Sequence, residues 1–191
     1  TELVAGGERM YAVDRGRGTA TELDPATLGV LTAPIPVAES LGAAVVDDAG
    51  VLWAIDEATG EAVRLDRETE LSRVAVIEPG VAGRLTVVDG AVTVADPDAA
   101  SLQVMDTTGT SVSTIELGEL SGADVHVPES VSAGTIVPIV DGDRLLLVDV
   151  RRGTVAVVTL DGAGPRLGKP VVAAAVAFVP DLDAASLEAV D

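Results

Sequence analysis

Four aspartates recur at the ends of short apolar segments, and carboxylates in such a pattern could either bind a cation or close turns. They are Asp14, Asp56, Asp96 and Asp149, spaced about forty residues apart with a longer interval before the last. Turn-forming residues follow each of them directly. One hypothesis is a ring of carboxylates or a metal site at one end of the fold. An Asp before a turn usually accepts hydrogen bonds from N–H groups one or two residues on, so we predict the turn role.

Three further acidic clusters offer the oxygen atoms that Ca²⁺ prefers. They are Asp47-Asp48, Asp141-Gly142-Asp143 and Asp181-Leu182-Asp183. None has the length or the number of ligands of an EF-hand loop. Exposed turns, and a helix cap at Asp183, are the preferred interpretation, and we predict no metal site.

His126 is the only imidazole in the chain. A zinc site usually needs more than one such ligand. A Ser-His-Asp arrangement would use His126 with Ser121, Ser130 or Ser132 as the nucleophile, but the sequence has no Gly-x-Ser-x-Gly motif. We therefore expect His126 to be a loop or edge residue, and the sequence predicts no catalytic residue.

Two other segments could in principle bind a ligand. Arg151-Arg152 could pair with a carboxylate, although a hairpin turn usually leaves such charges in solvent. The stretch Gly162-Ala163-Gly164-Pro165 lacks the strand and helix that flank a dinucleotide-binding loop. The chain has no cysteine, which excludes thiolate metal sites and thiol nucleophiles. We predict no cofactor.

The aspartates belong to a repeated pattern of short alternating strands and turns. In the second repeat, segments 43–46, 51–55, 61–65 and 73–77 read as a four-stranded antiparallel meander. A period near forty residues in an all-strand sequence is typical of propeller blades. We predict an all-β, β-propeller-type array of about four four-stranded antiparallel blades, which either closes as a small ring or forms part of a larger one.

The repeats place the whole chain, 1–191, in a single repeat domain. The longer interval before the fourth aspartate predicts a surface loop, and the last strand of the fourth blade is expected near 171–174. The C-terminal residues from Asp183 to Val190 favour a short helix. The expected limits are blades 1–38, 39–80, 81–120 and 133–175, a loop insertion 120–133, and a C-terminal strand or helix 173–191.

One blade resembles a known repeat family. Residues 54–60 read Ala-Ile-Asp-Glu-Ala-Thr-Gly and resemble the Ala-x-Asp-x-x-Thr-Gly pattern of the pyrroloquinoline-quinone-like propeller repeats. Residues 12–19 and 148–154 are looser copies, and NHL-like and YVTN-like repeats share the same rhythm. The resemblance implies a propeller and, as one alternative, a fragment of a quinone-dependent dehydrogenase-like enzyme whose catalytic residues lie outside this chain.

In that family a tryptophan late in the pattern docks one blade on the next. Here Arg64 occupies that position, with Glu22 and Val104 in the neighbouring repeats, and the only tryptophan, Trp53, comes before the pattern. A lone Trp among small residues can anchor a blade-to-blade contact or line a binding surface. We predict that Trp53 packs in the core.

The net charge of −19, from 31 acidic and 12 basic residues, disfavours binding to nucleic acid or anionic lipid. No apolar run reaches the roughly 18 residues of a membrane helix, so we expect no membrane insertion in this segment. The first residue is Thr rather than Met. We expect a processed, secreted or cell-surface bacterial protein.

These features favour a non-enzymatic binding or scaffold region, whose loops and edges contact a protein or carbohydrate ligand. Exposed blade edges could also support self-association. The enzyme-fragment hypothesis is the alternative.

Overall fold

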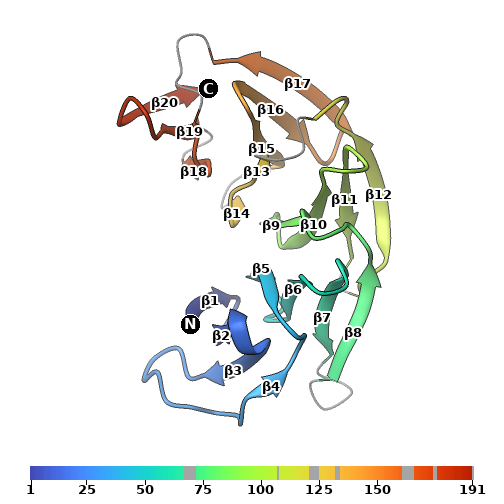
Figure 1. The fold of residues 1–191 in the computed structure, drawn as a ribbon, viewed down its shortest axis with the longest axis vertical. Coiled ribbons are helices and arrows are strands. Elements are labelled where there is room, and N and C mark those ends of the chain that lie inside the picture. Colours follow the sequence, from blue (N-terminus) through green and yellow to red (C-terminus); the bar gives the residue numbers. More distant parts are fainter. Residues whose placement is uncertain are drawn as a thin grey trace.

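The structure is a computed structural model that describes residues 1–66, 72–106, 108–120, 125–131, 134–160, 166–173 and 176–190. Within these ranges every regular element is a β-strand except one short 3-10 helix. The strands form five sheets, antiparallel apart from one short parallel pair. Figure 1 shows the sheets, called blades 1 to 5 in chain order, following one another around an arc. The predicted all-β, propeller-type array is confirmed.

Blades 1 and 2 are four-stranded meanders in which each strand pairs with the next one along the chain. Their elements are β1 (Glu2–Gly6), β2 (Arg9–Asp14), the 3-10 helix η1 (Arg15–Arg17), β3 (Thr19–Leu23) and β4 (Ile35–Pro36), then β5 (Leu41–Val46), β6 (Leu52–Asp56), β7 (Ala62–Asp66) and β8 (Ser72–Ile77).

The later blades depart from this simple order. In blade 3 a short strand, β14, pairs in parallel with β9, and blade 5 has three strands. Blade 3 contains β9 (Arg84–Val88), β10 (Ala91–Asp96), β11 (Ser101–Met105), β12 (Ser111–Glu116) and β14 (Ser130–Val131); blade 4 contains β13 (Val125–His126), β15 (Ile136–Asp141), β16 (Arg144–Asp149) and β17 (Thr154–Thr159); blade 5 contains β18 (Val171–Ala173), β19 (Val176–Asp181) and β20 (Ser186–Val190).

The hydrophobic core lies between the blades, in four clusters that join each blade to the next. Side chains alternate across a strand, so one strand can contribute to two clusters. In β16, Leu146 and Val148 pack against blade 3, whereas Leu145 packs against blade 5. Trp53 is 1% exposed and packs between blades 2 and 3. The prediction that Trp53 packs in the core is confirmed.

The segment between blades 3 and 4 differs from the expected surface loop. Where it is described, the predicted insertion 120–133 contains β13 and β14 at the inner edges of two sheets. Because β13 starts blade 4, the segment near 171–174 is not the last strand of that blade, and β18 begins a fifth blade instead. A two-residue strand is too short to show the alternation of apolar and polar residues by which strands are recognised, so the sequence does not predict β13 and β14.

Of the strand or helix expected at the C-terminus, the structure shows a strand, and the helix predicted from Asp183 to Val190 is wrong. Residues Ser186–Val190 form β20, which pairs with β19 along its whole length. Asp181 accepts hydrogen bonds from the N–H groups of Asp183 and Ala184 and so closes the hairpin between these strands. Pairing within the sheet overrides the helix propensity of the alanine-rich segment.

The arc is open on one side, and both chain ends lie at that side (Figure 1). The first strands of the blades, with β14, lie on its concave inner side. No helix within the described ranges has the length and apolar character needed to span a membrane.

Candidate functional site

A cavity of about 290 Å³ lies where the inner parts of blades 1 to 4 meet the segment before β18. We call it the axial cavity. Its wall is formed mainly by residues of β1, β5, β9 and β13, by the turns after β2 and β6, and by the segments before β14 and β18. The charged and polar members of the wall are Glu2, Arg15, Glu57, Arg84, His126, Glu129 and Lys169.

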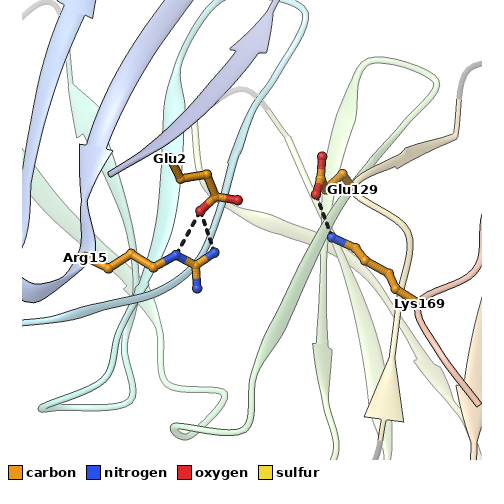
Figure 2. Close-up of polar contacts among 4 residues, drawn as sticks. All are labelled: Glu2, Arg15, Glu129 and Lys169. Atoms are coloured by element: carbon orange, nitrogen blue, oxygen red, sulfur yellow. Dashed lines mark hydrogen bonds and ion pairs between the residues drawn. The ribbon is translucent and has the colours of Figure 1, made fainter. Parts of the chain in front are cut away.

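Blade 1 contributes one ion pair to this wall. Glu2 stands at the start of β1, and Arg15 opens η1 directly after β2. The Nε and Nη2 atoms of Arg15 both donate to Oε2 of Glu2, at 2.8 and 2.6 Å. Figure 2 shows this fork on one side of the view. The pair holds both side chains at the cavity while leaving other polar atoms for a ligand.

A second ion pair faces it from the later blades. The Nζ atom of Lys169, before β18, donates to Oε1 of Glu129, before β14, at 2.8 Å (Figure 2). The two side chains are about half and two-thirds exposed, respectively. Because exposed ion pairs of this kind contribute little to stability, either member can exchange its partner for a charged ligand group at small cost.

Arg84 fixes the strand that carries the imidazole. Its Nε donates to the carbonyl of Val125 at 3.2 Å, and its Nη1 donates to the carbonyls of Ala82 and Gly83 at 2.6 and 3.1 Å. Val125 and Val127 are buried in the cluster between blades 3 and 4. Since neighbours on a strand alternate, His126 is turned to the cavity that it lines.

The axial cavity is balanced in charge although the chain is strongly acidic. Three glutamates, Glu2, Glu57 and Glu129, share the wall with three cations, Arg15, Arg84 and Lys169. The whole chain has only 12 basic residues against 31 acidic ones. This wall therefore suits a molecule that carries both donors and acceptors, or both signs of charge.

The four repeated aspartates close turns instead of meeting at one site. Asp14 accepts from the N–H of Arg17, Asp56 from that of Ala58, Asp96 from that of Ala99, and Asp149 from those of Arg151 and Arg152. This is the pattern expected of an aspartate before a turn. Within the described residues, no group of three or more acidic or histidine side chains is placed to hold a metal ion.

Hydrogen bonds to turn aspartates predict a pH dependence of stability. The N–H groups of Thr27 and Ala26 lower the pKa of Asp24, and the Thr108 hydroxyl and Thr110 N–H lower the pKa of Asp106. A lowered folded-state pKa stabilises the fold above the unfolded value, near pH 4, and this stabilisation is lost as pH falls through the folded pKa.

Urea unfolding at successive pH values checks this expectation. We expect the free energy of unfolding of the wild type to fall as the pH drops below about 4. Asp24→Asn and Asp106→Asn should have a lower free energy of unfolding at neutral pH and a smaller decrease below pH 4. If both variants lost as much stability below pH 4 as the wild type, these carboxylates would not contribute.

The other acidic clusters have structural partners. The carboxylate of Asp47 accepts from the N–H of Val51 at 2.9 Å and from Nε1 of Trp53 at 3.0 Å. The fully buried carboxylate of Asp141 pairs with Arg144. Neither Asp47 nor Asp141 lines the axial cavity.

Of the serines considered as nucleophiles beside His126, the structure describes only Ser130. Ser130, on β14, does not line the axial cavity. Ser121, Ser132 and the stretch 162–165 lie outside the described residues. Arg151 and Arg152 pair with Asp89 and Asp149 at 2.6 and 3.6 Å, in the turn after β16.

Sequence reasoning missed the axial cavity, but a signal was present. Arg15 and Glu57 each follow a repeated aspartate directly, at equivalent places in the first two repeats. In a propeller, equivalent turns of successive blades lie at the same end of the axis. A charged residue directly after the aspartate is therefore expected to lie at the end of the axis that carries the axial cavity.

No protein-family model matches the chain, and no curated protein matches it in sequence. Many solved structures share its fold. A streptogramin B lyase is 12% identical over 98% of this chain and 66% of its own, with a TM-score of 0.68. A catalytically inactive histidine-to-alanine variant of virginiamycin B lyase from Staphylococcus aureus, solved with quinupristin, is 10% identical over 99% of this chain and 65% of its own, with a TM-score of 0.74.

A third similar structure is the extracellular domain of a putative hybrid two-component system from B. thetaiotaomicron. It is 9% identical over 90% of this chain and 24% of its own, with a TM-score of 0.67. This chain spans about two thirds of the length of the two lyases. These similarities support the propeller fold. Assignment to the quinone-like, NHL-like or YVTN-like repeats remains a prediction.

The prediction that the chain is not an enzyme is wrong, because lyases share its fold over nearly its whole length. The prediction relied on missing catalytic motifs, but a propeller gathers its site from separate blades and needs no local motif. At identities of 9 to 12%, the similarity establishes the fold. What the chain acts on must be argued from its own residues.

Proposed function

We propose that the chain is part of a β-propeller enzyme that binds a small molecule of mixed charge in the axial cavity and acts on it by proton transfer at His126. The observation that carries this proposal is the position of His126. The only imidazole of the chain lines a cavity whose wall comes from blades 1 to 4 and the segment before β18, beside two ion pairs.

The charges of the wall indicate the class of ligand. A carboxylate on the ligand can bind to Arg15 or Lys169, and an ammonium group can bind to Glu2 or Glu129. Because each of these side chains already has a partner of opposite charge, a ligand that carries both signs of charge can bind to both members of a pair. Peptide-like molecules with both groups fit best.

A lyase-type reaction is the chemistry that suits an imidazole in this setting. In an elimination, a base removes a proton from carbon, the electrons of the C–H bond form a double bond, and the leaving group departs with its bonding pair. Imidazole exchanges protons near neutral pH and is the commonest side-chain base. Arg15 and Lys169 would stabilise negative charge on the departing group.

Because His126 is the only histidine, its ring protons give a single set of signals in an NMR spectrum of this 19.2 kDa chain. We expect glycylglycine and quinupristin, the ligand of the similar lyase, to shift these signals, and Arg15→Gln to weaken the effect. Arg17→Gln is the matched control, because Arg17 lies in the same 3-10 turn but outside the cavity. Signals that no such compound shifts would contradict the proposed site.

Product masses test the reaction class. Incubation with quinupristin and a panel of linear and cyclic peptides should give products whose masses add up to that of the substrate, as in an elimination, whereas hydrolysis adds one water. We expect His126→Gln to lower turnover about 100-fold, the low end for loss of a general base. Unchanged turnover in this variant would exclude the proposed role of His126.

We also propose that the protein works outside the cell or at its surface. The similarity to an extracellular domain supports this location. Fractionation of the native source should find the protein outside the cytoplasm, and recovery in the cytoplasm alone would contradict it. Binding of a protein or carbohydrate at the loops, and self-association at the blade edges, remain proposals that light scattering and glycan arrays can test.

A further inference from the structure

A second cavity lies between blades 4 and 5, and the proposed axial site does not use it. Its volume is about 430 Å³, within the range of small-molecule sites. It shares no lining residue with the axial cavity. The apolar part of its wall consists of Ile136, Pro138, Leu147, Val172, Ala177 and Val190.

The cavity exists because the two blades are packed together at one end only. At that end, Val140 and Leu145 of blade 4 meet Leu167 and Val179 and form a buried cluster. Further along the same face of β15, Ile136 remains 47% exposed. Opposite it, blade 5 offers the three-residue strand β18 and the small side chain of Ala177, which leave the space between the sheets unfilled.

The mouth of this cavity is polar and carries two cations. It is formed by Thr135, Asp149, Arg151 and Arg152. The two arginines are 71% and 80% exposed, and their ion pairs engage Nη2 of Arg151 and Nε of Arg152. A guanidinium carries five N–H donors, so both retain donors for a ligand. Two of only 12 basic residues thus stand at one apolar cavity in an acidic chain.

The carboxylate of Asp149 at the mouth does not prevent an anion from binding there, because its charge is already compensated. Its carboxylate accepts from the N–H groups of Arg151 and Arg152 at 3.0 and 3.1 Å and from the hydroxyl of Thr135 at 3.1 Å. Arg152 also faces its second oxygen. The exposed N–H groups of the two guanidinium groups therefore remain the donors that an anion can reach at the mouth.

We propose that the cavity between blades 4 and 5 binds an amphipathic carboxylate, with its apolar body between the sheets and its carboxylate at Arg151 and Arg152. Burial of apolar surface drives binding of the body, and a charge-assisted, forked hydrogen bond to a guanidinium orients the head. This second site is independent of the chemistry proposed for the axial cavity.

Calorimetric titration with decanoate and with decanol, its uncharged analogue, tests the proposal on the intact chain. We expect decanoate to bind more tightly than decanol. Arg152→Gln should weaken decanoate about tenfold, as loss of a hydrogen bond to a charged group does, and leave decanol unchanged. Arg17→Gln, an exposed arginine in blade 1, is the matched control and should change neither.

Filling the cavity gives an independent test. Ile136→Trp introduces a large side chain at a half-exposed position in the wall of the cavity. It should abolish binding of both compounds, and circular dichroism should show an intact fold. Ala177→Phe fills the opposite wall and serves as the second variant. Equal affinity for decanoate and decanol, no binding of either, or full binding by both folded filling variants would each overturn the proposal.

Discussion

Replacing Trp53 with alanine is expected to lower the free energy of unfolding by about 3–5 kcal/mol, the range measured for large aromatic side chains removed from cores. Trp53 packs between blades 2 and 3 against Leu85, Val94 and Met105. Its loss would leave a cavity that the rigid sheets cannot close. Urea unfolding followed by circular dichroism measures the change. A loss below about 1 kcal/mol would mean that this side chain does not hold the two blades together.

The polar edge of Trp53 can be separated from its bulk. Its Nε1 donates to Asp47 at 3.0 Å, so Trp53→Phe keeps most of the packing but leaves a buried carboxylate oxygen without this donor. We expect this variant to lose about 1–3 kcal/mol, the cost of an unmet buried acceptor. Equal losses in the Phe and Ala variants would show that the hydrogen bond dominates.

Replacing Gly18 with alanine should be the most disruptive single-methyl change in blade 1. Gly18 has φ of +60°, and a Cβ there would lie 1.9 Å from the carbonyl oxygen of Ala38, at the junction with blade 2. The carbonyl of Gly18 also accepts from the N–H groups of Val37 and Ala38. Strain and backbone clash together should cost more than about 2 kcal/mol, because left-handed backbone alone costs about 1–2.

Two other glycines separate these causes. Gly153 stands four residues after Asp149, as Gly18 stands four after Asp14; it has φ of +64° but nothing within 4 Å of its Cβ position. Gly16 has neither a positive φ nor a contact under 3.9 Å. We expect Gly153→Ala to cost about 1 kcal/mol and Gly16→Ala almost nothing. If Gly18→Ala lowered the free energy of unfolding no more than Gly153→Ala, the close approach of Gly18 to the carbonyl of Ala38 would not contribute to the cost.

The blades could be predicted because their signal is local. The strands β6 and β7 lie within one residue of the segments 51–55 and 61–65 expected from alternation, and the aspartates mark where second strands end. The short inner strands could not be found this way. Both β13 and β14 exist only because they pair with β15 and β9, which is a property of the assembled sheets.

The axial cavity was harder to predict because its residues are distant in sequence. Glu2 and Arg15 belong to blade 1, Arg84 to blade 3 and His126 to blade 4, and Lys169 lies in the segment before blade 5. Each looks like an ordinary surface residue in its own repeat. The curvature of the arc brings them together, and no single repeat contains that information.

The most direct test of the account is whether residues of blades 2 and 4 meet at one cavity. The chain has no cysteine, so Glu57→Cys provides a unique site for a nitroxide spin label. His126 supplies the only imidazole signals, and it lines the axial cavity with Glu57. Val30→Cys is the control, because Val30 is 69% exposed in the segment between β3 and β4, outside the cavity. We predict that the label at position 57 broadens the His126 signals and that the label at position 30 does not; unchanged signals with the label at position 57 would contradict the shared axial site.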